Sequence, residues 1–440
     1  MNKSLTSVLE KTIDTKGSKL LVKDETLLRE KLIDLLVFEA VFADNEEDKK
    51  EARLLIRKIA IAQSCPPSSI YSFYKAIGDG KIKQSFTVPA INVRMMTYDT
   101  AQIIFSLMQT HNSGPVVFEI ARSEIEYTAQ RPDEYAVVVL AAAIKEGYSG
   151  PVFLQGDHYQ FSKNKFSKDQ TQETEKIKSL IQESIKAAFY NIDIDASTLV
   201  DLSKTDLGQQ QKTNYTVTEE LTRYIRLLES KGTTIAIGAE IGHIGGKNSS
   251  KEDLIAFMQG YEKLLPKTQP GIGKISVQTG SSHGGLPDAS GKLIDVNIDF
   301  SVLKDTGDAA RSYGLAGVVQ HGASTLPENL FSEFPKHKTL EIHLATGFQN
   351  IVYETMPEAL RAKMHEWVLQ NCRDEKEEGW SEQQFIYKCR KKAIGPFKKQ
   401  LWQIHEKEKE PIRQALQKQF LFLFSKLNIV NQGHLQKAYA

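Results

Sequence analysis

Short apolar runs rich in β-branched residues alternate with amphipathic segments of helical periodicity along the middle of this chain. Strands that alternate with helices in this way form parallel βαβ units. Eight such runs favour a closed (β/α)8 TIM barrel over an open doubly wound sheet, and no Gly-x-Gly-x-x-Gly motif follows the first run to support dinucleotide binding. The predicted strands are Thr87–Arg94, Pro115–Arg122, Pro151–His158, Phe189–Ser197, Thr233–Gly242, Gly273–Gly280, Gly317–Ser324 and Lys338–Ala345.

The segments between these runs are predicted to be helices, and so are both ends of the chain. We expect a helical N-terminal extension at residues 1–84, a catalytic barrel at 85–355 and a helical C-terminal extension at 356–440. The apolar run from Phe420 to Phe424 is expected to cover the barrel or a neighbouring subunit. The clearest helices within the barrel are predicted at Asp99–His111, Pro132–Glu146, Gln172–Ala187, Thr216–Ser230 and Lys251–Leu264.

The charge balance excludes several kinds of partner. Lys and Arg number 56 and Asp and Glu 55, so no global charge points to nucleic acid or to an anionic membrane.

The charged N-terminus lacks the apolar core of a signal peptide, and no run of about 18 apolar residues predicts a membrane span. The spacing of Cys65, Cys372 and Cys389 fits neither a disulfide nor a metal site. We expect a cytoplasmic protein.

Five of the ten histidines fall at or just beyond the ends of predicted strands: His158, His243, His283, His321 and His343. The carboxyl ends of barrel strands share one rim, where the active sites of this fold lie. His158, His283 and His321 each lie close to a glycine, which allows an ion to approach the backbone, and three imidazoles suit a catalytic zinc with an open position. A single histidine is more often a structural hydrogen-bonding group, and that alternative stays open for His243 and His343.

Several carboxylates fall near the same strand ends. Adjacent residues on a regular strand point to opposite faces, so proton transfer fits Asp157 better than metal ligation beside His158. Glu240 stands in an otherwise apolar strand, where a carboxylate requires a partner such as a metal ion. A helix cap for Asp157 and an ion pair for Glu240 remain alternatives. Asp193 and Asp195 alternate on one side of their strand, and at least one of them should face the barrel mouth.

Glycine- and hydroxyl-rich turns follow the last three predicted strands, at Gly280–Gly285, Gly322–Ser324 and Ala345–Gly347. The loops after strands seven and eight commonly bind phosphate in a barrel of this kind. One such turn is weak evidence, but three of them beside a predicted metal site indicate a phosphorylated substrate.

Taken together and in this order, the segments resemble the class II, zinc-dependent fructose-bisphosphate aldolase family. The resemblance covers roughly residues 85–350. Each of its motifs is weak alone, whereas the ordered set is specific. The motifs are Ala90–Val93, Gly156–His158, Asp195–Ser197, Ala239–Gly242 with Gly245-Gly246, Gly280–Gly284, Val296–Phe300 and His321–Ser324.

The resemblance implies roles for the metal-binding and catalytic residues. His158, His283 and His321 would bind one catalytic Zn2+, and Glu240 could contact the metal in an alternative position. Asp157 would exchange a proton with the substrate hydroxyl during carbon–carbon cleavage, while the zinc acts as a Lewis acid on the ketone. The sequence argues against a Schiff-base route, because Lys274 stands at the start of its predicted strand, on the opposite side of the barrel.

The resemblance also implies a set of residues that contact the phosphorylated substrate. The loops that carry them often hold a monovalent cation in this family, such as K+ or Na+. The expected substrate and phosphate contacts are Asn92, Gly284, Gly322, Ser324 and Thr346.

The chain departs from the family pattern at three places. The family usually has an acidic base on the loop after Gly245-Gly246, whereas this chain has Lys247–Ser250, with Glu252 and Asp253 as the nearest acids. Strand eight usually ends in an Asn-x-Asp-Thr pattern, of which only Thr346 is kept. Gln155 stands where the family commonly has histidine. We therefore expect an intact metal site with altered substrate contacts.

The resulting expectation is a zinc-dependent aldolase, a homodimer or homotetramer, that cleaves fructose 1,6-bisphosphate to glycerone phosphate and glyceraldehyde 3-phosphate. Tagatose bisphosphate or another sugar phosphate is the alternative substrate. A noncatalytic aldolase-like partner subunit is favoured by the missing acidic base and opposed by the three histidines. A metal-dependent barrel hydrolase would need His-x-His on the first strand, where Ile91-Asn92-Val93 stands.

Overall fold

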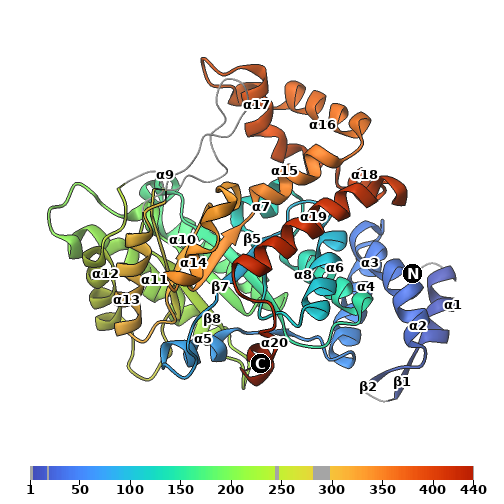
Figure 1. Ribbon diagram of the computed structural model, residues 1–440, viewed down its shortest axis with the longest axis horizontal. Helices are drawn as coiled ribbons and strands as arrows, with labels where there is room; N and C mark the ends of the chain where they lie inside the picture. Colours follow the sequence, from blue (N-terminus) through green and yellow to red (C-terminus); the bar gives the residue numbers. More distant parts are fainter. Residues whose placement is uncertain (1–2, 17–18, 243–246, 281–297, 440) are drawn as a thin grey trace.

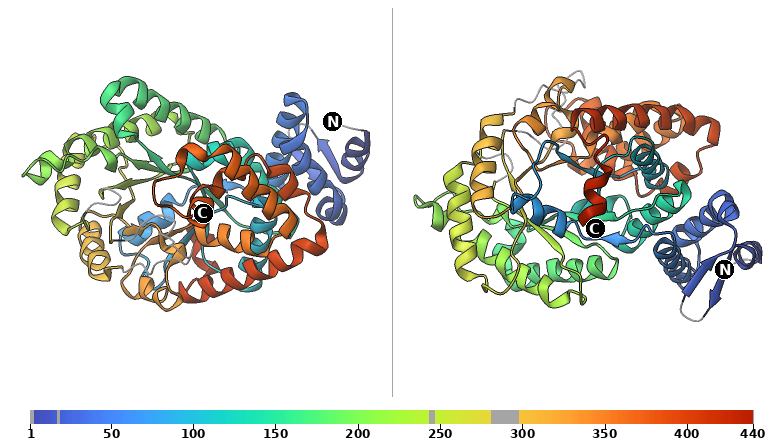
Figure 2. Two further views of the ribbon diagram at one scale, coloured as in Figure 1. Left: turned by 90° about the horizontal axis from the view of Figure 1, so that it is seen from above. Right: turned by 60° about the horizontal axis from the view of Figure 1, so that its bottom comes forward.

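The computed structural model describes residues 3–16, 19–242, 247–280 and 298–439. These residues form a closed barrel of eight parallel strands surrounded by helices (Figures 1 and 2), which confirms the predicted TIM barrel. The strands pair in chain order, and β11 pairs with β4 to close the barrel. The barrel strands are β4 (Val88–Asn92), β5 (Val117–Ala121), β6 (Val152–Gln160), β7 (Asn191–Asp195), β8 (Ala236–Glu240), β9 (Lys274–Val277), β10 (Val318–Gln320) and β11 (Glu341–Leu344).

Helices cover the outside of the barrel, and local capping signals fix several of their ends. The bounds of α8 and α12 coincide with the predicted ones. Helix α8 has Pro132 in its first turn and ends at Gly147, whose φ of 66° suits a residue without a side chain. Helix α12 begins with a capping box between Ser250 and Asp253. The barrel helices are α6 (Thr97–Thr110), α7 (Arg122–Tyr127), α8 (Pro132–Glu146), α9 (Lys163–Lys168), α10 (Gln170–Lys186), α11 (Leu207–Leu228), α12 (Lys251–Leu264), α13 (Phe300–Ser312), α14 (Glu333–Lys336) and α15 (Thr346–Thr355).

The N-terminal region differs from its all-helical prediction, because β1 and β2 form an antiparallel hairpin. The four residues of each strand show no clear apolar–polar alternation, so the sequence pattern did not single the hairpin out. Further along, α5 lies at the end of the barrel where the strands begin (Figure 2, right). The elements are α1 (Lys3–Thr12), β1 (Ile13–Lys16), β2 (Lys19–Val22), α2 (Glu25–Leu27), α3 (Ile33–Phe42), α4 (Glu46–Ala62), β3 (Pro67–Ser68) and α5 (Tyr71–Gly78).

The C-terminal region returns along the side of the barrel. The apolar run of α19 packs inward, with the ring of Phe420 4.7 Å from that of Phe348 on α15. The chain then reaches the end of the barrel where the strands begin, where the amide of Thr87 donates to the carbonyl of Leu427 at 3.0 Å. The helices are α16 (Glu358–Asn371), α17 (Glu382–Cys389), α18 (Lys398–Trp402), α19 (Glu406–Lys426) and α20 (Gly433–Tyr439).

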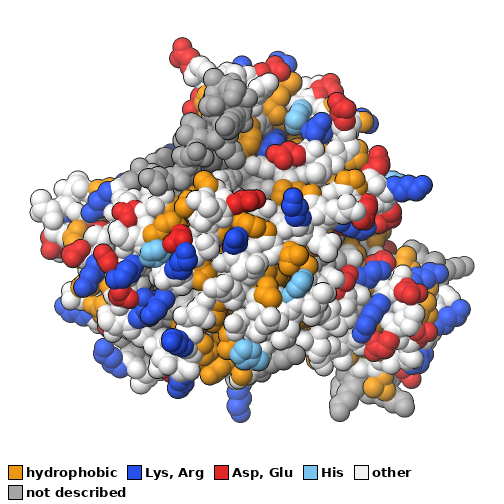
Figure 3. Space-filling view, in the orientation of Figure 1, with side chains coloured by type: hydrophobic (Ala, Val, Ile, Leu, Met, Phe, Trp, Pro, Cys, Tyr) orange, Lys and Arg blue, Asp and Glu red, His pale blue; other side chains and the backbone are white. Residues whose placement is uncertain are grey.

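Acidic and basic side chains are interspersed on the face of the molecule shown in Figure 3, as the nearly balanced sequence charge suggests. Among the residues that the structure describes, no helix is both long and apolar enough to cross a membrane.

Candidate active site

A bulge in β6 brings Asp157 and His158 to the same side of their strand. Between Gly156 and Tyr159 the pairing with β7 shifts, so that β6 has one residue more than its partner. His158 takes the unusual φ of 41° at this point. Both side chains therefore line one cavity, although regular strand alternation predicts opposite faces.

His158 is held by carboxylates from the two following strands. Its Nδ1 lies 2.8 Å from Asp195 Oδ2 and 3.1 Å from Glu240 Oε2. Burial opposes protonation of His158, but the acids Asp157 and Glu240 outweigh it and raise the pKa of the imidazole well above its usual value. Burial and nearby Asp195 raise the pKa of Glu240 to about 7. Because Nδ1 contacts the carboxylates, Nε2 is the ring nitrogen at which a metal ion would displace the proton and bind.

His321 follows β10, and its ring lies between those of two other histidines. The ring centroids are 3.9 Å apart for His158 and His321, and 4.1 Å apart for His321 and His343. His321 Nε2 is 3.0 Å from the hydroxyl of Ser276 on β9. Three imidazoles from β6, β10 and β11 thus converge at the mouth of the barrel.

The residues present fit a metal ion. Asp157, His158 and His321 each offer a ligand atom, and these atoms lie within 4.8 Å of one another. The hydrogen bond between Asp195 and His158 is the arrangement that orients metal-binding histidines. His283 and Gly284, predicted as the third zinc ligand and as a phosphate contact, lie outside the described residues, as does the strand-end His243.

The predicted substrate contacts surround the same cavity, which measures about 420 Å³. The carboxamide oxygen of Asn92 is buried there and has no hydrogen-bond partner among the described residues. Gly322 has a φ of 69°, in the left-handed region, and starts the turn that carries Ser324. Ser324 Oγ accepts the amide of Gly347 at 3.1 Å. Thr346 Oγ1 accepts from Arg94 at 3.2 Å.

Four cationic side chains line this cavity, and sequence reasoning singled out none of them. Arg94 pairs with Glu124 at 2.6 Å and Arg122 with Glu173 at 2.7 Å. For the other two, no ion pair appears among the described residues. The four are Arg94, Arg122, Lys165 and Lys391, the last from the C-terminal region.

Below the mouth, a buried charge network fills the barrel. Lys274 Nζ lies 3.0 Å from Asp193 Oδ2, donates to Gln155 Oε1 at 2.8 Å and pairs with Glu341. Burial lowers the pKa of Lys274, but Asp193 and Glu341 raise it more, so that the amine stays protonated. A protonated, fully engaged lysine cannot act as a Schiff-base nucleophile.

Glu119 and Glu341 are two further acids of this interior that sequence reasoning missed. Both are fully buried. Glu119 interrupts the apolar strand β5, so the signal that singled out Glu240 also applies to it, whereas Glu341 is the first residue of β11 and gives no such signal. Burial raises the pKa of Glu119 well above its usual value, and the negative charge of Asp157 is the next largest cause of the rise.

Of the two acids nearest to the missing base, Glu252 is exposed in the first turn of α12 and Asp253 is engaged in the cap of that helix. Asp253 is buried and accepts from the amide and hydroxyl of Ser250, which caps α12. Its other oxygen lies 3.4 Å from Lys247 Nζ. Residues 243–246, including Gly245-Gly246, lie outside the described residues.

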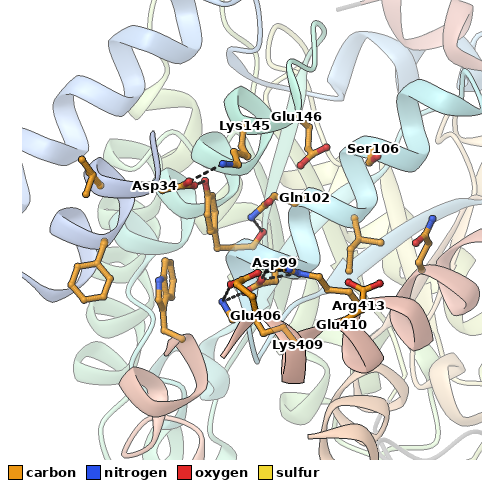
Figure 4. A pocket seen from close by; sticks show the side chains of 16 residues that line it. Asp34, Asp99, Gln102, Ser106, Lys145, Glu146, Glu406, Lys409, Glu410 and Arg413 are labelled. Atoms are coloured by element: carbon orange, nitrogen blue, oxygen red, sulfur yellow. Dashed lines mark hydrogen bonds and ion pairs between the residues drawn. The ribbon is translucent and has the colours of Figure 1, made fainter. Parts of the chain in front are cut away.

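A larger cavity of about 760 Å³ lies away from the barrel mouth, between α3, α6 and α19 (Figure 4). Its cationic groups are paired with acids: Lys145 bonds to Asp34 at 2.7 Å, and Arg413 and Lys409 hold Asp99. Tyr98 stacks on Trp402 with ring centroids 5.7 Å apart. These contacts join the N-terminal and C-terminal helices across α6.

Comparison with known proteins adds a family match. Residues 74–408 match the family model described as "Fructose-bisphosphate aldolase class-II". No curated protein sequence matches the chain.

Solved structures match the chain at low sequence identity. A probable tagatose 6 phosphate kinase from Sinorhizobium meliloti 1021 is 13% identical with a TM-score of 0.56, over 77% of this chain and 100% of that one. Fructose-bisphosphate aldolase from Campylobacter jejuni is 18% identical with a TM-score of 0.46, over 82% and 94% of the two chains. A putative fructose-1,6-biphosphate aldolase from Coccidioides immitis is 16% identical with a TM-score of 0.46, over 82% and 96%.

Proposed function

The chain belongs to the class-II fructose-bisphosphate aldolase family, and we propose that it catalyses metal-dependent, reversible aldol cleavage of a phosphorylated ketose. Fructose 1,6-bisphosphate is the first substrate to test, and tagatose bisphosphate the second. The observation that carries the proposal is the bulge of β6, which places the acid Asp157 and the ligand-type His158 at one cavity beside His321.

We propose Zn2+ as the ion, held by His158 and His321 together with His283, with Glu240 as an alternative contact. When bound, the ion would supply Lewis-acid polarisation of the substrate ketone. Asp195 orients the imidazole of His158 through its 2.8 Å contact with Nδ1. Lys274 plays no covalent part, because its ammonium is occupied by Asp193 and Glu341.

Asp157 accepts the proton from the hydroxyl group on the carbon that becomes the aldehyde. In the reverse direction the same carboxyl group returns this proton to the new hydroxyl. General acid–base catalysis of this type typically contributes roughly 10²–10⁴-fold. Asp157 is buried, 5% exposed, at the cavity wall, so bulk water has little access to the carboxylate.

Phosphate binding is assigned to the turns after β10 and β11, with Gly322, Ser324 and Thr346, and to the cations of the cavity. Arg94 already donates to Thr346 Oγ1, so it lies within reach of a group bound at the N-terminus of α15. Lys165 and Lys391 add positive charge at the cavity without an ion pair among the described residues. A monovalent cation in the same loops and a homo-oligomeric assembly remain predictions.

A noncatalytic, aldolase-like partner subunit is the second candidate. It is favoured by the loop after β8, where Lys247 follows Gly245-Gly246 and the acid Asp253 is used to cap α12. Such a protein would keep the barrel and the metal-binding groups without turnover.

A coupled assay for triose phosphate release tests the proposal. The enzyme is supplied with fructose 1,6-bisphosphate or tagatose bisphosphate, before and after removal of metal with a chelator and again after addition of Zn2+. We expect activity that disappears with the metal and returns with it. Activity that survives complete metal removal contradicts the mechanism, and zinc-loaded protein inactive on every ketose bisphosphate supports the noncatalytic candidate.

A further inference from the structure

His343 contacts two acids, one at the barrel mouth and one deeper in the barrel interior. Its Nδ1 lies 3.1 Å from Asp157 Oδ1 at the mouth, and its Nε2 lies 2.7 Å from Glu341 Oε1 in the interior. Glu119 Oε2 is also 3.1 Å from Nδ1. The ring is buried, with 5% of the residue exposed, and it lines the cavity that Asp157 lines.

Glu341 is a fixed acceptor. It is fully buried on β11, and it accepts from the hydroxyl of Tyr74 on α5 and from Lys274 on β9. An ionised carboxylate has no proton to donate, so in its contact with His343 it also accepts, and His343 Nε2 is the donor. Gln155 on β6 also donates to Glu341 Oε1, at 3.3 Å. Three separate elements therefore set the position of Glu341, and Glu341 in turn sets the orientation of the imidazole.

Asp157 needs such support, because it lies in the bulge of β6, where the regular pairing with β7 is interrupted. A carboxylate that must accept a proton at a defined atom has to be held in a single orientation. We infer that His343 is a positioning residue, which holds the Asp157 carboxylate for proton transfer while Glu341 holds the imidazole. Both carboxylates only accept, so the ring bonds to the two acids simultaneously as the imidazolium, which donates from both nitrogens. Burial lowers the pKa of His343, but Glu119 and Asp157 raise it well above its usual value, which favours this form.

The inference rests on the proposed function for its catalytic meaning, and steady-state kinetics test it first. We expect His343→Leu to lower kcat on the order of 10²-fold or more, with KM changed less than about threefold and metal content unchanged. His343→Asn, whose amide can still donate towards Asp157, should retain more kcat than His343→Leu. His337→Leu, a half-buried histidine at the end of α14, is the matched control and should leave kcat unchanged.

Three kinetic outcomes overturn the inference. The first is a His343→Leu enzyme whose kcat stays within about twofold of the wild type. The second is loss of bound metal from His343→Leu, which would place His343 in the metal site instead. The third is a raised KM with unchanged kcat, which would make His343 a substrate contact.

Nuclear magnetic resonance of histidine-labelled protein tests the contact without any turnover. The ring N–H resonances of His343, assigned by their loss in His343→Asn, should shift in Asp157→Asn and again in Glu341→Gln. If neither substitution moves them, the contacts do not exist in solution and the inference fails. If they shift while the wild type cleaves no ketose phosphate, the proposed function fails and the positioning contact stands.

Discussion

The two main cavities of this protein differ in what their charged groups do. In the larger one, between the terminal helices, every lining cation is paired with an acid, such as Arg413 with Asp99 and Lys145 with Asp34 (Figure 4). The smaller one, at the barrel mouth, gathers histidines and acids around a space where the carboxamide oxygen of Asn92 has no partner among the described residues. Volume alone therefore does not identify the site. The better indicator is a buried polar group that has no partner in the protein and is therefore left for a ligand.

Removing a metal-binding histidine should have the largest effect. We expect His321→Ala to lose the bound metal and all turnover, because its ring lies against that of His158 at the converging ligand atoms. Metal content measured by mass spectrometry on purified protein, together with the coupled assay, checks this. A variant that retains stoichiometric zinc would show that His321 is not a ligand.

Replacing the proposed base should have the next largest effect. Asp157→Ala should keep the metal and lower kcat by roughly 10²–10⁴-fold, since only the proton acceptor is removed. The ligand atoms of Asp157, His158 and His321 lie within 4.8 Å of one another, so metal content must be measured in the same preparation. Loss of the ion from this variant would assign Asp157 as a ligand.

Breaking a charge pair in the larger cavity should change stability and leave catalysis intact. Arg413→Met leaves the buried Asp99 with a single cation contact among the described residues, Lys409 at 3.5 Å. The free energy of unfolding should therefore fall by about 1–3 kcal/mol. Urea titration and the coupled assay measure the two quantities. Lys304→Met, which breaks an exposed i,i+4 pair with Asp308 on α13, is the control and should change neither. A large loss of turnover in Arg413→Met would show that the two cavities communicate.

Local sequence signals were enough to predict most of the barrel. The helix start at Pro132 and the helix end at Gly147 depend on the conformational limits of proline and glycine, which act within a few residues. The apolar runs predicted each barrel strand, although β6 continues two residues beyond its predicted end at His158. The N-terminal hairpin was missed because its strands have only four residues each, too few for a clear period among the neighbouring helices.

The candidate site was predictable only in part. The glycines and strand ends singled out His158 and His321, which the structure brings together. Whether Asp157 and His158 share a face depended on one extra residue in β6, and sequence alternation alone argued against it. The positions of Lys391 and Lys165 at the cavity could not be inferred either. The residues next to a lysine in the sequence do not indicate which distant segments lie beside it in the folded protein.

The sequence by itself determined the alternation of strands and helices, the ligand-type residues at the strand ends and the family. These properties are encoded by neighbouring residues, whose periodicity and chemistry do not depend on the rest of the chain. Only the tertiary structure decided that His343 lies between Asp157 and Glu341, 186 and 2 residues away along the chain. Contacts of this kind form when the last barrel strand pairs with the first, and barrel closure is a property of the whole chain.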